Sequence, residues 1–335
     1  MMKFLFSNDL VTESKKHIAF LEGLHALGVT FVEATATSLR RYEDFWLPLV
    51  ASTNDDMVPP SDIAWLWHCH RLAPARYERY TTQRFGRILD PTPAFVFYEA
   101  TPDDMTRAGW ESKYPNEPFL LPEGFSDDPC DRGAGMVGGF DLLGSTRRQG
   151  TFLWHVSAPC FQDDAFLKQG VEQYFKFLTL KRENGDLPLV PTFQIDLMWH
   201  THMLGSLVKY NRDCLDVRGE RFHHDDSFDD RTPDAPLDRA FKATAALWKK
   251  VYDEEYATEL GMYRGEPPKS YYDREWKAMD AAAFEDLRPV HVGGSSSSGM
   301  DARGTVDTTD DTDIVVSSPF ADSSLPGKFK PRTPG

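Results

Sequence analysis

The residues best suited to chemistry are four histidines in two matching segments, Trp67-His68-Cys69-His70 and Trp199-His200-Thr201-His202. Imidazole is the commonest metal ligand near neutral pH, so paired histidines suggest a zinc or iron site. Two histidines at i and i+2 on a regular helix point roughly 200° apart. One ion therefore cannot take both histidines of one segment unless the helix is broken there.

The second segment carries more potential ligands than the first. Asp196 lies four residues before His200 and shares its helix face, whereas Ala64 stands at the equivalent position of the first segment. Downstream, His223-His224-Asp225-Asp226 could fold back beside His200. Two imidazoles and a carboxylate would suit zinc or non-haem iron. A shared ion requires nitrogens from two of these histidines to approach within about 5 Å.

The alternative interpretation treats Trp67-His68 and Trp199-His200 as packing anchors. Each histidine would then hydrogen-bond a buried carbonyl or carboxylate, as partly buried histidines usually do. The spacing matches no HExxH or Cx₂C motif, no calcium loop, no glycine-rich phosphate loop and no GxSxG elbow. Catalytic residues therefore stay unassigned, and both interpretations remain open.

An internal repeat relates the two segments at an offset of 132 residues. At that offset several positions carry the same residue type in both copies. The first of these pairs is Tyr42 and Tyr174, the last is Leu72 and Leu204, and Pro59 and Pro191 form another. Such self-similarity indicates a tandem duplication. If the copies are equivalent, their Trp-His helices should superpose and lie close together about a pseudo-twofold axis.

The pattern of each copy predicts a helix, a loop and a second helix. We therefore expect a mainly α fold with few short strands. Pro74 should kink or split the first Trp-His helix, while the second is expected to run from Pro191-Thr192 to about Val217. Further helices are expected over 12–27 and 237–260, and short strands over 94–98 and 151–156. The expected organisation is a first helical repeat (1–114), a Pro/Gly-rich linker (115–150), a second helical repeat (151–291) and a disordered tail (292–335).

Composition narrows the class of protein. The net charge of −15 disfavours nucleic-acid binding, because phosphate backbones repel such a surface. No apolar run is long enough to span a membrane, and the N-terminus lacks the apolar stretch of a signal peptide. Four scattered cysteines are typical of reduced thiols. We therefore expect a cytoplasmic protein, with the nucleus as the alternative compartment.

Residues 63–72 and 191–202, together with His223-His224-Asp225-Asp226 and the helix around Trp248, resemble the glycine-rich domain-containing protein family of plants and fungi. The resemblance covers roughly residues 10–260. It implies a regulatory protein linked to development and stress, with no settled enzymatic activity. Plant members carry further C-terminal modules, including a glycine-rich region and an RNA-binding segment. This sequence does not match those modules, so the RNA function is not carried over.

Two functions follow as hypotheses. The first is an intracellular regulatory or protein-interaction domain without catalytic activity, which needs no cofactor and has an unidentified protein partner. The alternative is a metal-binding protein or metal-dependent enzyme that uses the histidines of the two segments.

Overall fold

The chain folds into a mainly helical structure, as predicted. The computed structural model describes residues 6–32, 34–53, 55–91, 93–99, 105–122, 135–185, 187–219, 221–222, 224, 234–257 and 266–278. The expected disordered tail over 292–335 lies outside the described residues.

The first half of the chain contains six α-helices and one π-helical turn among its described residues. In chain order they are α1 (Leu10–Ala26), α2 (Ala36–Arg40), η1 (Arg41–Trp46, π-helical), α3 (Leu47–Ala51), α4 (Ser61–Arg71), α5 (Pro74–Phe85) and α6 (Met105–Lys113).

The second half repeats this series after a two-stranded antiparallel hairpin, and its described residues also hold two short 3₁₀ turns. Its elements are β1 (Met136–Val137), β2 (Phe140–Asp141), α7 (Leu142–Gln149), α8 (Phe152–His155), η3 (Pro159–Gln162), α9 (Asp164–Glu183), α10 (Phe193–Gly205), α11 (Leu207–Arg218), α12 (Pro236–Tyr252) and η4 (Lys269–Tyr272).

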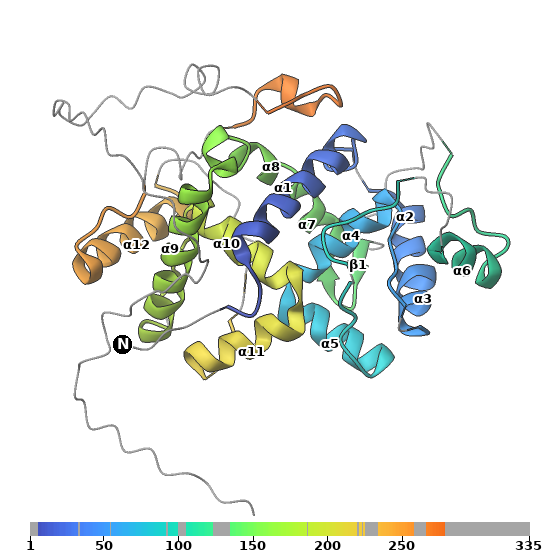
Figure 1. Cartoon of the computed structure of the whole chain (residues 1–335), viewed down its shortest axis with the longest axis horizontal. Helices are drawn as coiled ribbons and strands as arrows, with labels where there is room; N and C mark the ends of the chain where they lie inside the picture. Colours follow the sequence, from blue (N-terminus) through green and yellow to red (C-terminus); the bar gives the residue numbers. More distant parts are fainter. Residues whose placement is uncertain are drawn as a thin grey trace, which may run out of the picture.

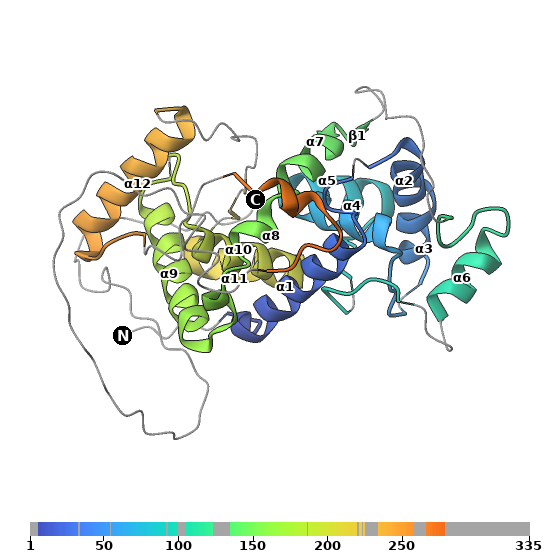
Figure 2. The ribbon, with the colours of Figure 1, turned by 90° about the horizontal axis from the view of Figure 1, so that it is seen from above.

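Equivalent helices occupy matching places in the two halves. The Trp-His helices α4 and α10 contact each other at the centre, while α6 and α12 lie at opposite ends of the molecule in both views (Figure 1, Figure 2). The structure therefore agrees with the duplication predicted from the sequence offset.

The helices that lead into the two copies are exchanged. Helix α1 packs on α9 and α10 of the second copy, whereas α7 packs on α4 of the first. Both leading helices start at an aspartate that caps them, Asp9 for α1 and Asp141 for α7, again 132 residues apart. The side chain accepts hydrogen bonds from first-turn amides, which stabilises each helix start. The core is consequently built from interleaved elements of both copies.

Some predicted boundaries were wrong. The helix expected from 191 to 217 is broken at Ser206, whose extended backbone separates α10 from α11 and whose hydroxyl caps α11. Helix α12 ends at Tyr252 and not at residue 260, because Asp253 after it adopts a left-handed conformation with φ 54°. Residues 152–155 form α8 where a strand was expected. Pro74, by contrast, begins α5 and splits the first Trp-His helix as predicted.

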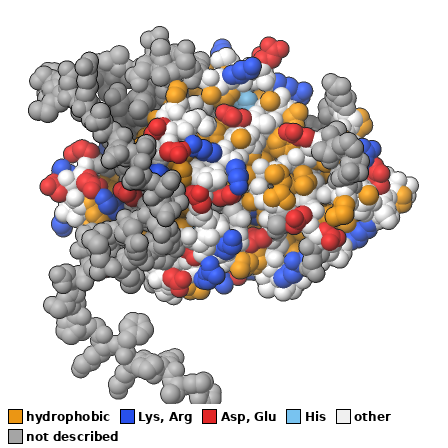
Figure 3. Space-filling model, in the orientation of Figure 1, with side chains coloured by type: hydrophobic (Ala, Val, Ile, Leu, Met, Phe, Trp, Pro, Cys, Tyr) orange, Lys and Arg blue, Asp and Glu red, His pale blue; other side chains and the backbone are white. Residues whose placement is uncertain are grey.

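Among the described residues, no helix is long and apolar enough to cross a membrane. On the face seen in Figure 3, the described acidic and basic side chains are interspersed and form no continuous basic stripe. The proposed domain limits stay predictions. Within the stretch expected to link the copies, residues 136–149 hold the hairpin and α7.

Candidate metal centre

Asp196 and His200 lie one turn apart on α10. The Thr192 hydroxyl accepts a hydrogen bond from the amide of Ile195 at 3.2 Å and so caps the helix start. The helix carries the two side chains on the same face, with His200 Nε2 3.3 Å from Asp196 Oδ1. The sequence spacing predicted this pairing.

His224 joins them from the loop after α11. Its Nδ1 lies 2.9 Å from the carbonyl oxygen of Leu72, and its Nε2 lies 3.0 Å from His200 Nε2. Because a carbonyl oxygen only accepts, Nδ1 of His224 must be the donor. In neutral His224 the Nε2 lone pair is then directed at the other two groups, which is the tautomer a metal ligand needs.

The three ligand atoms form a compact triangle. They all lie within 4.8 Å of one another, with His224 Nε2 3.9 Å from Asp196 Oδ1 as the longest of the paired distances. Ligands bound at about 2.1 Å with tetrahedral or octahedral angles would be about 3.0–3.4 Å apart. Small side-chain rotations would therefore suffice to place all three atoms around one ion.

The triangle is largely buried and is most exposed at the aspartate. The side chains of His200 and His224 are 1% and 8% exposed, whereas Asp196 is 18% exposed. The Phe152 ring packs against His200 at 4.5 Å, and the Trp199 ring meets His224 edge-on at 5.1 Å. Aromatic walls fix both imidazoles, while the aspartate side faces outward.

His202 does not join this group. Its Nδ1 lies 3.1 Å from the Tyr174 hydroxyl and its Nε2 lies 3.1 Å from Asp213 Oδ2. Burial lowers the pKa of His202, although hydrogen bonding to Asp213 opposes this. The opposite orientation of His200 and His202 is the one that helix geometry predicted.

No equivalent centre forms among the described residues of the first copy. His70 Nδ1 lies 2.9 Å from the Tyr42 hydroxyl, and this contact corresponds to that between His202 and Tyr174 in the second copy. Burial lowers the pKa of His70 to about 3. His68 stacks between Trp65 and Phe20 at 5.2 and 5.5 Å between ring centroids. With Ala64 in place of an aspartate, the chain brings no ligand set together around His68 in its described part.

The two tryptophans of the motif lie in the core. Trp67 Nε1 donates to the Tyr77 hydroxyl at 2.7 Å, and Trp199 Nε1 donates to the Tyr210 hydroxyl at 2.9 Å. Both indoles are almost fully buried. These paired contacts fit the packing interpretation of the tryptophans.

Sequence reasoning missed two contributors. His17 on α1 lies 3.0 Å through Nδ1 from the Thr201 hydroxyl, next to His200, and the Leu72 carbonyl orients His224 from the other copy. The exchange of α1 onto the second copy places His17 beside the site, and the sequence offset of 132 residues did not predict this contact. His223, which was considered with His224, lies outside the described residues.

The fold and the site define a duplicated helical protein with a two-histidine, one-aspartate cluster in its second copy. A family model described as Glycine-rich domain-containing protein-like matches residues 3–79 and 76–213. The chain is 33% identical over 281 residues to Glycine-rich domain-containing protein 2 of Arabidopsis thaliana, covering 80% of this chain and 36% of that protein. It is 31% identical over 306 residues to Glycine-rich domain-containing protein 1 of the same plant, covering 85% and 37%.

The chain therefore belongs to the glycine-rich domain-containing protein-like family, as the sequence resemblance indicated. It spans little more than a third of the length of these curated relatives. No solved structure matches it significantly.

Proposed function

We propose that this chain is a metal-binding protein whose second copy holds one divalent transition metal ion through Asp196, His200 and His224. The observation that carries the proposal is the convergence of one oxygen and two nitrogen atoms within 4.8 Å of one another. The three residues come from two segments that meet only in the folded chain.

The ligand types favour zinc or ferrous iron. Two imidazoles and one carboxylate form the facial set of non-haem iron sites, and zinc sites that bind substrate also keep three protein ligands and an open position. The contact from His224 to the Leu72 carbonyl fits the outer-shell hydrogen bond that usually orients a metal-bound histidine. Either metal would keep at least one position for water or a ligand.

A titration of chelator-treated, untagged protein with Co²⁺ tests the proposal, because cobalt reports a protein nitrogen and oxygen environment by its visible absorption. We expect saturable binding in the unmodified chain and at least about tenfold weaker binding in Asp196→Asn, since a neutral amide is a poor ligand for a divalent ion. Asp216→Asn, on the exposed side of α11, is the matched control and should bind like the unmodified chain. Equal affinity of all three proteins would refute the site.

A protein-interaction domain without catalysis is the second candidate function. Val208 and Leu215 favour it, because these exposed apolar residues lie two turns apart on α11. A protein partner, the absence of nucleic-acid binding and a cytoplasmic or nuclear location stay predictions from composition and resemblance.

A further inference from the structure

Three buried polar side chains gather beside the candidate metal centre. His17 from α1 and His68 from α4 have ring centroids 5.2 Å apart, and Arg71 lies one turn after His68. Within the described part of the chain, His17 Nε2, His68 Nδ1 and Arg71 Nε are buried and have no hydrogen-bond partner. Buried polar atoms are normally satisfied, so this group calls for an explanation.

Arg71 carries a positive charge that no carboxylate among the described residues pairs with. Its Nη1 donates to the Leu204 carbonyl and its guanidinium lies over the Trp67 ring at 5.5 Å. None of the ion pairs formed by described residues involves Arg71. The nearby carboxylate of Asp90 accepts instead from the amides of Leu207 and Val208 at the start of α11. A desolvated cation without a paired anion is costly.

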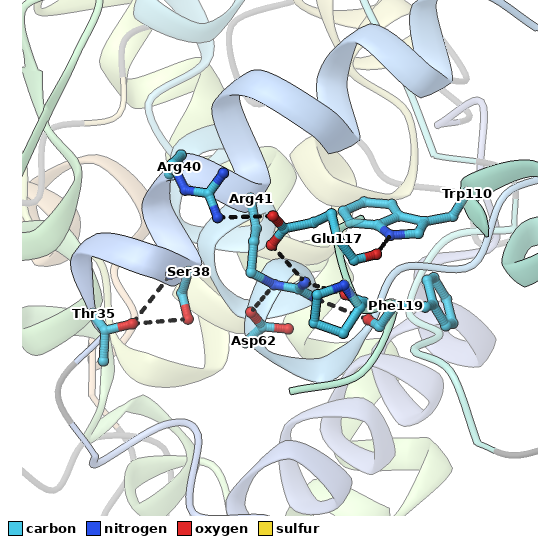
Figure 4. Close-up of polar contacts among 9 residues, drawn as sticks. Thr35, Ser38, Arg40, Arg41, Asp62, Trp110, Glu117 and Phe119 are labelled. Carbon is cyan, nitrogen blue, oxygen red and sulfur yellow. Dashed lines mark hydrogen bonds and ion pairs between the residues drawn. The ribbon is translucent and has the colours of Figure 1, made fainter. Parts of the chain in front are cut away.

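Arg41, the other deeply buried arginine among the described residues, shows how this chain satisfies a guanidinium. Arg41 donates to Asp62 at 3.2 Å, to Glu117 at 3.4 Å and to the carbonyl of Phe119 at 2.7 Å (Figure 4). Arg41 thus has two carboxylate partners and Arg71 has none among the described residues. The contrast indicates that an anion from outside the chain would complete the surroundings of Arg71.

The histidines can donate to such an anion. The pKa of His17 is lowered well below its usual value, mainly by burial and to a smaller extent by His200 and Arg71. The pKa of His68 is also lowered well below its usual value, mainly by burial and to a smaller extent by His17, Arg71 and His200. Both shifts favour the neutral form of each ring. If His17 Nδ1 accepts from the Thr201 hydroxyl, its Nε2 carries the proton and is a donor.

We propose that His17, His68 and Arg71 bind an oxyanion group of a small dianionic ligand whose other oxygens coordinate the metal held by Asp196, His200 and His224. This inference deepens the proposed metal site and rests on it. His17 Nδ1 lies 3.0 Å from the hydroxyl of Thr201, the residue after His200, and the Leu72 carbonyl that holds His224 belongs to the residue after Arg71.

Charge balance selects the ligand class. The Asp90 carboxylate is balanced by the amides and the positive end of the dipole at the start of α11. The divalent ion, the Asp196 carboxylate and the Arg71 guanidinium then leave two positive charges in excess, which a dianion neutralises. A dicarboxylate and inorganic phosphate share this chemistry. The flat, bidentate shape of guanidinium suits both, because carboxylate and phosphate oxygens match its fork geometry.

Calorimetric titration of zinc-loaded protein with oxalate, phosphate and acetate tests the inference. We expect saturable binding of oxalate or phosphate, the stronger of the two identifying the source of the oxyanion, and weaker binding of monoanionic acetate. Arg71→Met should weaken the dianion at least about tenfold, while Arg71→Lys, which keeps the charge without the fork, should weaken it less. Arg76→Met, exposed on α5, is the matched control and should bind as the unmodified chain does.

The outcomes separate the two proposals. Failure to load either zinc or ferrous iron refutes the metal site itself. Stoichiometric zinc with no saturable dianion binding, or with equal affinity in Arg71→Met and Arg76→Met, refutes the anion site and leaves the metal site standing. If Arg71→Met fails to fold by circular dichroism, His17→Asn replaces it. His17→Asn removes the Nε2 donor without changing the charge, and undiminished dianion binding by this variant would overturn the inference.

Discussion

At the scale of single residues, Trp199 shows how the motif supports the core. Its indole is 3% exposed, packs on Phe177 and donates to Tyr210. Trp199→Ala should lower the free energy of unfolding by about 3–5 kcal/mol, because burial is lost and a cavity remains. Urea denaturation measures the change. Leu215→Ala, at an exposed position of α11, should change it by less than about 0.5 kcal/mol. Equal stability of both variants would show that Trp199 is no core residue.

His70 should make the fold sensitive to acid. Its pKa is about 3 in the folded chain, because burial disfavours the charged ring, against 6.5 as the ordinary value. Between these values the unfolded chain binds a proton that the folded chain does not, so stability falls as pH decreases from about 6.5 towards 3. In His70→Gln, the pH dependence of the unfolding free energy should decrease by about one proton over this window. An unchanged slope in urea titrations between pH 4 and 7 would contradict the assignment.

The sequence predicted part of the candidate site for clear physical reasons. Helical spacing alone places Asp196 beside His200 and directs His202 away from it. The choice of His224 depends on how a loop returns to Leu72 in the other copy, which no local pattern encodes. The position of His17 next to Thr201 depends on the exchange of α1 onto the second copy, and no sequence pattern predicts it either.

At the scale of elements, the close approach between the α7–α8 junction and the segment after α1 limits what Gly150 can become. A Cβ atom there would lie 2.6 Å from the backbone oxygen of Thr30, which cannot move aside cheaply. Gly150→Ala should cost about 1–3 kcal/mol of unfolding free energy. Gly109→Ala in α6, where no atom lies within 4 Å of the added Cβ, should instead stabilise by up to about 1 kcal/mol through helix propensity. Thermal melts that show the same sign for both variants would contradict this packing.

Element types were more predictable than element ends. The α1 and α4 helices follow from apolar spacing and from Pro74, whereas Ser206 interrupts its helix because Asp90 of the other copy accepts from the first amides of α11. Asp253 ends α12 in a left-handed turn that asparagine or glycine would have signalled more clearly. Such tertiary influences override local propensity.

At the scale of the whole molecule, the candidate metal centre is a junction between the copies. Asp196 and His200 belong to α10, while the loop residue His224 is held by Leu72 of the first copy. A metal ion that binds only the folded chain stabilises it by mass action, and here it would also fasten the loop to the first copy. Metal binding should therefore strengthen the contact between the two halves as well as the local fold.

The metal content of protein purified without an affinity tag shows whether Asp196, His200 and His224 hold an ion. We expect stoichiometric zinc or iron in the unmodified chain and its loss in His200→Ala, with the helical circular dichroism retained. The packing interpretation predicts no stoichiometric metal in either protein and a stability lower by roughly 1–3 kcal/mol in the variant, because a buried partner is left unsatisfied. Metal-free unmodified protein that cannot be loaded with zinc or ferrous iron would contradict the claim.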